Sequence, residues 1–191
     1  MYIEFEVKFY IDLESFCQKL QKLNVECIKK KTLMKRLIFE APGAKNSQIR
    51  VRDEGNEIRL SYKSYDASKM IDSLQEVDVL VDDFDKTCEI LTLLGLKKMR
   101  YVQNYREVFR FDECFLMIDQ WPALEPLVEI EGPSKEVVEK VVSSLGFAMD
   151  NAMYGPTSKL YEQVYGISRE QFEKIEILTF ENIPTMLKKD D

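Results

Sequence analysis

The chain has 191 residues and a net charge of −7, so it is long enough for one domain with a substantial core. Its acidic balance argues against a protein that coats a nucleic acid polymer or an anionic membrane, although basic residues gathered in one cavity could still bind a small anion. Histidine is absent, which excludes Ser-His-Asp and Cys-His catalysis and His-ligated zinc.

The sequence shows no charged leader followed by an apolar run and no long apolar stretch. We therefore expect neither a signal peptide nor a membrane span, and a cytoplasmic location. The four cysteines, Cys17, Cys27, Cys88 and Cys114, lack Cys-x-x-Cys spacing and each adjoins an apolar segment. This pattern predicts buried free thiols in a reducing compartment.

The first predicted strand, residues 3–10, has two different faces. Glu4, Glu6 and Lys8 share one face, and the other face is apolar, because side chains alternate along a strand. The last predicted strand, residues 127–131, places Glu129 and Glu131 on one face in the same way. Each pattern alone also fits a solvated strand, but four carboxylates on two strands could converge on Mg²⁺ or Mn²⁺, which prefer oxygen ligands.

After the first strand, Asp12 is expected to cap a helix whose apolar residues recur at helical spacing up to Leu23. The basic run 29–31 is predicted to be a solvated turn. A strand follows over residues 33–40 and ends at Ala41-Pro42-Gly43.

Residues 48–63 predict a hairpin with its turn at 53–56. Arg50 and Arg52 share one face of the first arm, and Arg59 and Lys63 share one face of the second. A sheet exposed on one side would give the same pattern. The cations of this hairpin and the carboxylates of the first and last strands nevertheless suit a polyphosphate bridged by a metal ion. Arginine binds phosphate bidentately and lysine binds it as a point charge, while the acids would hold the metal.

A polar loop at 64–73 precedes a strand over 74–81, in which Glu76 and Asp78 share one face. A helix capped by Asp82 or Asp83 then runs to Leu94. The next strands are expected at 102–111, with Asn104 and Arg106 on one face, and at 115–119.

Trp121 is expected to be a packing anchor rather than a stacking platform. A helix capped at Ser134 should run to Leu145, and shorter helices are expected at 158–165 and after Ser168, where Gln171 completes a capping box. The tail, residues 187–191, is predicted to fray.

These elements predict an α+β protein with about eight strands, mostly antiparallel. A closed eight-stranded antiparallel β-barrel with a charged lumen and helices packed on the outside would satisfy every strand and leave no edge unpaired. The prediction is a single domain over residues 1–191, with most of the barrel in 1–133 and the C-terminal helices and tail in 134–191.

In chain order, these motifs resemble those of the CYTH superfamily, the triphosphate tunnel metalloenzymes. This superfamily includes class IV adenylate cyclases, thiamine triphosphatases and inorganic triphosphatases. The resemblance covers nearly the whole chain. It rests on Glu4-Phe5-Glu6-Val7-Lys8, Arg50-x-Arg52, Lys63, Glu76-x-Asp78, Arg106, the segments 118–122 and 160–166, and Glu129-Ile130-Glu131-Gly132.

The resemblance implies an eight-stranded tunnel that binds a triphosphate group together with Mg²⁺ or Mn²⁺. It implies that the metal ligands or their close support are Glu4, Glu6, Glu129 and Glu131. The cations that hold phosphate oxygens would be Lys8, Arg50, Arg52, Lys63 and Arg106. The remaining acidic lumen positions, which would hold a second metal or orient the cations, are Glu76, Asp78 and Asp119.

Two positions depart from the pattern of the family's hydrolases. Asn104 stands where they often carry a lysine that can act as a base, and Ile38 stands where a tyrosine is expected. The catalytic base is therefore unassigned, and Lys98 or Arg100 could reach the same space. The cyclases tend to carry a His-Phe pair ahead of the first motif, and this chain has no histidine.

Three functions remain open. The first is metal-dependent hydrolysis of inorganic triphosphate or of a nucleoside or other organic triphosphate. The second is a class IV adenylate cyclase that makes cyclic AMP from ATP, and the third is a module that binds polyphosphate or nucleotide without turnover. The expected partner is a triphosphate-containing small molecule, and the sequence leaves the oligomeric state open, a homodimer included.

Overall fold

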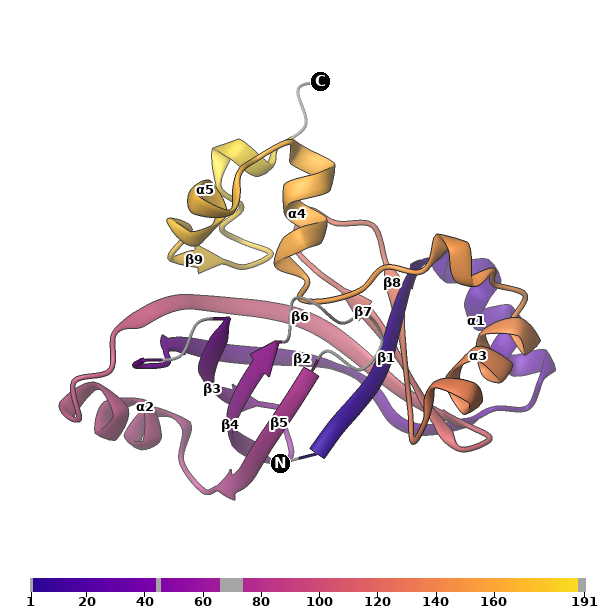
Figure 1. Cartoon of the computed structure of the whole chain (residues 1–191), viewed down its shortest axis with the longest axis horizontal. Coiled ribbons are helices and arrows are strands. Elements are labelled where there is room, and N and C mark those ends of the chain that lie inside the picture. Colours follow the sequence, from indigo (N-terminus) through magenta and orange to yellow (C-terminus); the bar gives the residue numbers. More distant parts are fainter. Residues whose placement is uncertain (1, 44–45, 66–73, 189–191) are drawn as a thin grey trace.

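The computed structural model describes residues 2–43, 46–65 and 74–188, except for the side chains of residues 2–4, 65 and 74–75. Nine strands form one sheet with the order β2-β3-β4-β5-β1-β8-β7-β6-β9. Figure 1 shows the sheet curled on itself, with helices on its outer side. The strands are β1 (Tyr2–Tyr10), β2 (Glu26–Glu40), β3 (Ser47–Asp53), β4 (Ile58–Tyr65), β5 (Leu74–Val81), β6 (Lys98–Phe111), β7 (Cys114–Gln120), β8 (Leu127–Gly132) and β9 (Ile177–Leu178).

The two ends of the eight-stranded part meet where β2 pairs with β6. All of its pairings are antiparallel, and β9 adds a short parallel pairing to β6. The pairing of β1 with β5 covers only residues 2–4 and 74–76. The predicted antiparallel barrel is therefore confirmed as a curled, barrel-like sheet. The prediction that no edge stays unpaired is wrong in part, because within the described chain β5 has no strand beside it past Glu76 on the β1 side.

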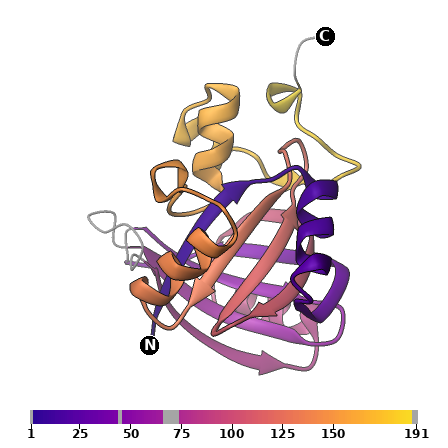
Figure 2. The ribbon, with the colours of Figure 1, turned by 90° about the vertical axis from the view of Figure 1, so that its right-hand side faces the viewer.

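Helices cover the apolar outer face of this sheet at two places. On one side, α1 (Leu13–Lys22) and α3 (Lys135–Ser144) bury Phe16, Leu20 and Val138 against strands β1, β7 and β8; Figure 2 looks onto this side. On the other side, α2 (Phe84–Leu93) packs Cys88 and Leu91 against β2 and β3. Because the apolar faces lie under helices, the polar faces of the strands turn inward.

The helix starts follow the predicted capping chemistry. The side chains of Asp12, Asp83 and Ser134 accept hydrogen bonds from backbone N–H groups in the first turns of α1, α2 and α3. Ser168 and Gln171 form the predicted capping box of α5 (Arg169–Glu173). None of the described helices is long and apolar enough to cross a membrane.

The C-terminal segment closes against the barrel at two places where neighbouring strands diverge. Met153 pairs with the backbone of Lys8 in β1 through two hydrogen bonds, and β9 pairs with β6. The helices that follow, α4 (Ser158–Tyr165) and α5, pack Leu160, Tyr161 and Phe172 around Trp121. In Figure 1, α4, α5 and β9 lie together above β6 and β1. The short 3₁₀ helices are η1 (Met149–Asn151) and η2 (Thr185–Leu187).

Some sequence-based predictions are wrong in detail. The lysine run 29–31 lies within β2, not in a turn, and irregular register along this stretch lets it stay extended beside β6. The strand β6 begins at Lys98 rather than 102. Leu187 is buried in the core with Trp121 and is not frayed, whereas residues 189–191 lie outside the described chain. All four cysteines are free, but Cys27 is exposed and Cys17 is half-buried.

Candidate functional site

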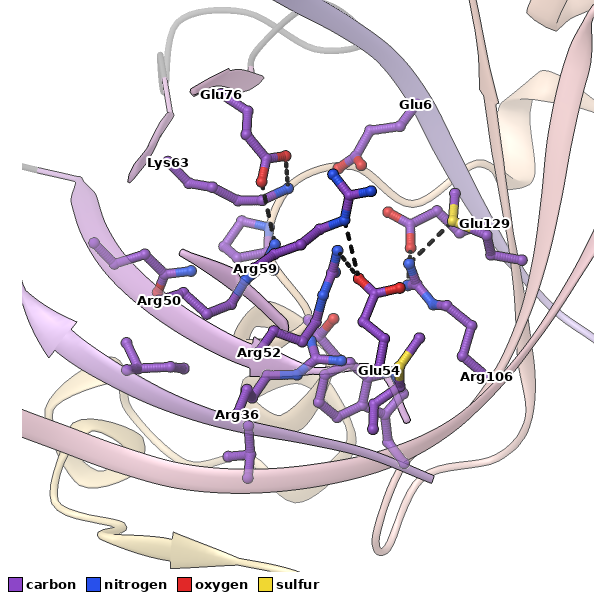
Figure 3. A pocket seen from close by; sticks show the side chains of 18 of the residues that line it. Glu6, Arg36, Arg50, Arg52, Glu54, Arg59, Lys63, Glu76, Arg106 and Glu129 are labelled. Carbon is purple, nitrogen blue, oxygen red and sulfur yellow. Dashed lines mark hydrogen bonds and ion pairs between the residues drawn. The ribbon is translucent and has the colours of Figure 1, made fainter. Parts of the chain in front are cut away.

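A cavity of about 530 Å³ runs through the inside of the curled sheet. Strands β1 to β8 all contribute lining residues, and residues 155–158 with Tyr161, Phe172 and Leu178 of the C-terminal segment line it as well. Figure 3 shows carboxylates and cationic side chains gathered around this space. The predicted charged lumen is therefore present.

One wall of the cavity carries carboxylates from neighbouring strands. Glu6 of β1 lies opposite Glu131 of β8 in the register, and Lys8 lies opposite Glu129. We call Glu6, Glu129 and Glu131 the carboxylate wall. Lys8 Nζ stands between two of these acids, 2.8 Å from Glu6 Oε1 and 3.2 Å from Glu129 Oε1. A single lysine therefore neutralises part of this wall.

The acids of the carboxylate wall perturb one another. Burial raises the pKa of Glu6 to about 7 against the pull of Lys8, and the neighbouring Glu129 carboxylate adds to the increase. Burial would also raise the pKa of Glu129, but Lys8 and Arg106 hold it well below its usual range. Burial and then Glu129 raise the pKa of Glu131. Glu131 forms no ion pair or hydrogen bond with any residue of the described chain.

The donor set of this wall fits a hard divalent cation. Oxygen ligands on adjacent strands would gain from a positive charge between them, because burial raises the pKa values of Glu6 and Glu131, and Glu131 is unpaired. Among the described side chains, no three acids form a group close enough to hold a metal ion, and the side chain of Glu4, the fourth expected ligand, lies outside the described residues. Glu6, Glu129 and Glu131 line the cavity and are the described acids that would contribute ligands to such an ion.

The opposite wall carries arginines. In the circuit of eight strands, β2 lies four places from β1 and β3 lies four places from β8. Arg36 of β2 is the register partner of Arg52 in β3. We call Arg36, Arg50 and Arg52 the arginine wall (Figure 3). Arg52 forms an ion pair with Glu54 at 2.5 Å, and Arg50 forms one with Glu76 at 3.2 Å.

Arg36 differs from its two neighbours. Its side chain is 5% exposed, and it donates a hydrogen bond to Asn104 Oδ1 while its guanidinium lies 4.7 Å from the centre of the Trp121 ring. Among the described residues it has no carboxylate partner. Burial, followed by the charges of Arg50, Arg52 and Arg106, lowers the pKa of Arg36 well below its usual value.

Arg106 of β6 joins the carboxylate wall to a buried acid behind it. Its guanidinium donates to Asp119 Oδ1 at 2.6 Å, to Asp119 Oδ2 at 2.5 Å and to Glu129 Oε2 at 2.7 Å. Burial would lower the pKa of Arg106, but these two acids raise it well above its usual value. Asp119 also accepts from Asn104 Nδ2 at 3.0 Å. Asp119 therefore fixes Arg106 and Asn104 and is absent from the cavity lining.

Comparison with known proteins agrees with this geometry. A model of the CYTH domain matches residues 2–160. The chain belongs to the CYTH family. It is 25% identical to a protein of Methanocaldococcus jannaschii named "Putative adenylate cyclase", over 78% of this chain and 93% of that protein.

Solved CYTH-like structures show the same fold. A conserved hypothetical protein of Pyrococcus furiosus superposes with a TM-score of 0.69 at 25% identity, over 78% of this chain and 94% of that chain. An adenylyl cyclase-named protein of Hippeastrum, described with a dominant triphosphatase activity, superposes with a TM-score of 0.57 at 17% identity, over 88% of this chain and 97% of that chain. The second likeness concerns the fold alone.

The remaining CYTH positions predicted from the sequence also face the cavity. Lys63 pairs with Glu76, and Asp78 pairs with Arg59 at 2.6 Å. Glu76 and Asp78 thus form ion pairs with cations of the cavity, and their expected roles stay predictions. Lys98 is exposed.

Arg100 lines the cavity, but its donors are used by the backbone oxygens of Ile175 and Phe172 at 2.7 Å each. It therefore ties the C-terminal segment to β6. Trp121 is the predicted packing anchor, since it lies in the core cluster with Leu127 and Leu160, and it is also the surface on which Arg36 stacks.

Sequence reasoning missed two residues of this site. Arg36 could have been found, because Leu37 and Phe39 face α2 and alternation then turns Arg36 inward. Glu54 could not, because it lies in the β3–β4 turn, and only the folded turn brings it to Arg52 and within 3.1 Å of Lys29.

Proposed function

We propose that this CYTH protein hydrolyses a triphosphate-containing compound with the help of Mg²⁺ or Mn²⁺. The observation that carries the proposal is the pair of opposing walls in one buried cavity, one of carboxylates and one of arginines. Each wall has a member without a charged partner in the described chain, Glu131 and Arg36. A metal-bridged phosphate chain supplies both missing charges at once.

The residues present suit phosphoryl transfer, which depends mainly on positioning and on charge neutralisation. Lys8, Lys63 and Arg106 line the cavity with the arginine wall, and we expect them to hold phosphate oxygens. Glu76 keeps Lys63 and Arg50 in place from β5. A divalent cation, when bound, would neutralise charge on the phosphate oxygens next to the carboxylate wall.

The catalytic base remains unassigned. Both ends of the Asn104 amide are used, its oxygen by Arg36 and its nitrogen by Asp119, and Ile38 offers no proton acceptor. Arginine remains protonated and cannot serve as a base at neutral pH. The proposal therefore assigns this chain's residues to binding, orientation and charge neutralisation.

Two alternatives give different products. An adenylate cyclase, the name carried by the archaeal relative, would release cyclic AMP and pyrophosphate from ATP. A binding module would be stabilised by tripolyphosphate and metal without any product. The Hippeastrum protein shares the fold, is named for a cyclase and is described with a dominant triphosphatase activity, so a cyclase name does not by itself decide between the two activities.

Product analysis separates the three. The purified protein is incubated with tripolyphosphate or with ATP, each with Mg²⁺ and with Mn²⁺. We expect phosphate release that is lost in Glu131→Gln and retained in Glu113→Gln, a change in the exposed turn between β6 and β7. Cyclic AMP would establish the cyclase instead, and ligand-induced stabilisation without product would establish the binding module.

A further inference from the structure

Arg36 is a buried cation that forms no ion pair in the described chain, and Asp119, behind Asn104, offsets only part of its charge. Its partners are the Asn104 amide and the face of the Trp121 ring, both uncharged. Its Nε atom is buried without a hydrogen-bond partner. A buried guanidinium without a counter-charge is costly, and Arg50 and Arg52 beside it increase that cost.

The orientation of Arg36 is fixed rather than accidental. Asp119 can only accept hydrogen bonds, so Asn104 must direct its Nδ2 toward Asp119 and its Oδ1 toward Arg36. Asn104 is 0% exposed, and its amide therefore cannot turn toward water. A lysine at this position would place a second cation against Arg36.

Arg36 lies at the side of the cavity that the C-terminal segment lines. Trp121, on which it stacks, packs in one cluster with Leu160, Tyr161 and Phe172. In Figure 3, Arg36 lies away from Glu6 and Glu76, with Arg52 between. A group bound at Arg36 is therefore held against the C-terminal segment, at one end of the bound molecule.

The clustering of guanidinium groups around Arg36 indicates which end of the bound molecule lies there. A terminal phosphate carries roughly two negative charges near neutral pH and a bridging phosphate roughly one, because only the terminal group has the second ionisation near pH 6. Arg36 has no ion pair of its own, and the guanidinium groups of Arg50 and Arg52 lie beside it although each is paired with an acid, so this group matches the more highly charged phosphate. Their planar forks also match the three free oxygens of a terminal phosphate.

We infer that Arg36, together with Arg50 and Arg52, binds the terminal phosphate of a linear phosphate chain, so that any organic group lies on the side away from Trp121. The ligand class rests on the proposed function, but the binding does not require turnover. Ligands with a free terminal phosphate, such as inorganic tripolyphosphate, are then preferred over phosphates that lack one.

The test compares two substitutions of neighbouring cations in β2. Arg36→Met removes the buried guanidinium at similar volume, and Lys35→Met removes the exposed ammonium one residue away on the outer face. Binding of tripolyphosphate and of cyclic trimetaphosphate, which has no terminal phosphate, is measured by calorimetry in EDTA. We expect Arg36→Met to weaken tripolyphosphate binding about 10- to 100-fold and to lose the preference for the linear over the cyclic compound.

Lys35→Met should leave both affinities within about twofold of the wild type, as expected for an exposed charge. Wild-type affinity for tripolyphosphate in Arg36→Met, or an intact preference for the linear compound, would overturn the inference. Arg36→Lys provides a second variant that keeps the charge and loses the fork, and it should bind tripolyphosphate with intermediate affinity.

Two further readouts separate binding from a merely structural role. Trp121 is the one tryptophan of the sequence, so its fluorescence reports directly on Arg36, and tripolyphosphate should change it saturably in the wild type but not in Arg36→Met. Without ligand, Arg36→Met should melt within a few degrees of the wild-type temperature, because the loss of the donor to Asn104 offsets the relief of the buried charge. A structural role would instead lower the melting temperature strongly. Binding is measured in EDTA, whereas phosphate release is measured with Mg²⁺ or Mn²⁺. A protein that releases no phosphate can therefore still confirm the inference, and a protein that releases phosphate can still contradict it.

Discussion

The carboxylate wall and the arginine wall face each other across one cavity, yet they solve the problem of buried charge differently. On the first, Lys8 and Arg106 bind Glu6 and Glu129 directly, so most of the charge is neutralised within the protein. On the second, Arg36 is held by a neutral amide and an aromatic ring. Each wall keeps one member without a charged partner in the described chain, since Arg50 and Arg52 pair with Glu76 and Glu54. Glu131 can lose its charge by taking up a proton, whereas Arg36 stays charged, so the second wall needs an anion.

This difference separates residues that stabilise the fold from residues that serve a ligand. Removing one partner of a buried ion pair leaves a buried charge behind and destabilises a protein strongly. Removing a buried charge that has no partner relieves a cost instead. Replacing Arg106, which pairs with the carboxylate wall, should therefore cost far more stability than the same change at Arg36.

The largest effect is expected from Arg106→Met. It leaves Asp119 and Glu129 without their shared guanidinium, and we expect a loss of about 3–5 kcal/mol in the free energy of unfolding. Arg36→Met should lower the free energy of unfolding by less than about 1 kcal/mol or raise it. Lys35→Met should change the free energy of unfolding by less than about 0.5 kcal/mol. Urea denaturation measures all three, and equal losses for the two arginines would refute the distinction between the walls.

A smaller effect is expected at Asn104, which lies between Arg36 and Asp119. Asn104→Lys places an ammonium group against Arg36, and we expect it to destabilise the protein by about 2 kcal/mol through repulsion between buried like charges. In the double variant with Arg36→Gln, the new lysine can pair with Asp119 and most of the loss should be recovered. A double-mutant cycle from urea denaturation gives the coupling, and additive losses would show that Asn104 and Arg36 do not depend on each other.

Much of the fold was predictable because local signals agreed with the barrel. Period-two alternation in β1, β3, β4 and β8 identified both strands and inward faces, and the caps at Asp12, Asp83 and Ser134 set the helix starts. The lysine run 29–31 was wrongly predicted as a turn, because three adjacent cations are typical of a solvent-exposed turn. Its pairing with β6 depends on backbone atoms, which the side chains do not reveal. The burial of Leu187 comes from packing with distant residues, which no local pattern encodes.

The site was predictable as a set of residue types but not as a network. Alternation placed Glu6, Lys8, Arg50 and Glu131 toward the lumen, and the structure puts each of them there. Sequence alone could not decide whether Asp119 faces the cavity or the back of Arg106, because that depends on pairing between β6 and β7. Its assignment as a metal ligand stays a prediction.

Magnesium should distinguish the unpaired acid from the paired ones. We expect Mg²⁺ at about ten times its dissociation constant to stabilise the wild type by about 1.4 kcal/mol, and EDTA to reverse the effect. Glu131→Gln should lose this stabilisation because it removes the wall's unpaired carboxylate, while Glu113→Gln should keep it. Thermal melts with and without Mg²⁺ provide the measurement, and an undiminished Mg²⁺ effect in Glu131→Gln would place the cation elsewhere.

The smallest effect is expected from Trp121→Phe, which tests how much of the arginine wall depends on the ring beneath Arg36. Phenylalanine keeps an aromatic face and removes an indole Nε1 that has no hydrogen-bond partner in the described chain. The cation–π contribution falls only in part, so we expect a loss of about 0.5–1 kcal/mol in stability. Tripolyphosphate affinity, measured by calorimetry, should fall less than about threefold because the Arg36 donors remain.

Phe115→Leu is the matched control, since Phe115 also lines the cavity and stacks under a different arginine, Arg110, at 5.6 Å. It should leave tripolyphosphate affinity unchanged. If Trp121→Phe weakened binding as much as Arg36→Met, the ring rather than the guanidinium would be the group that contacts the ligand. The arginine wall would then bind its ligand by stacking and not by charge.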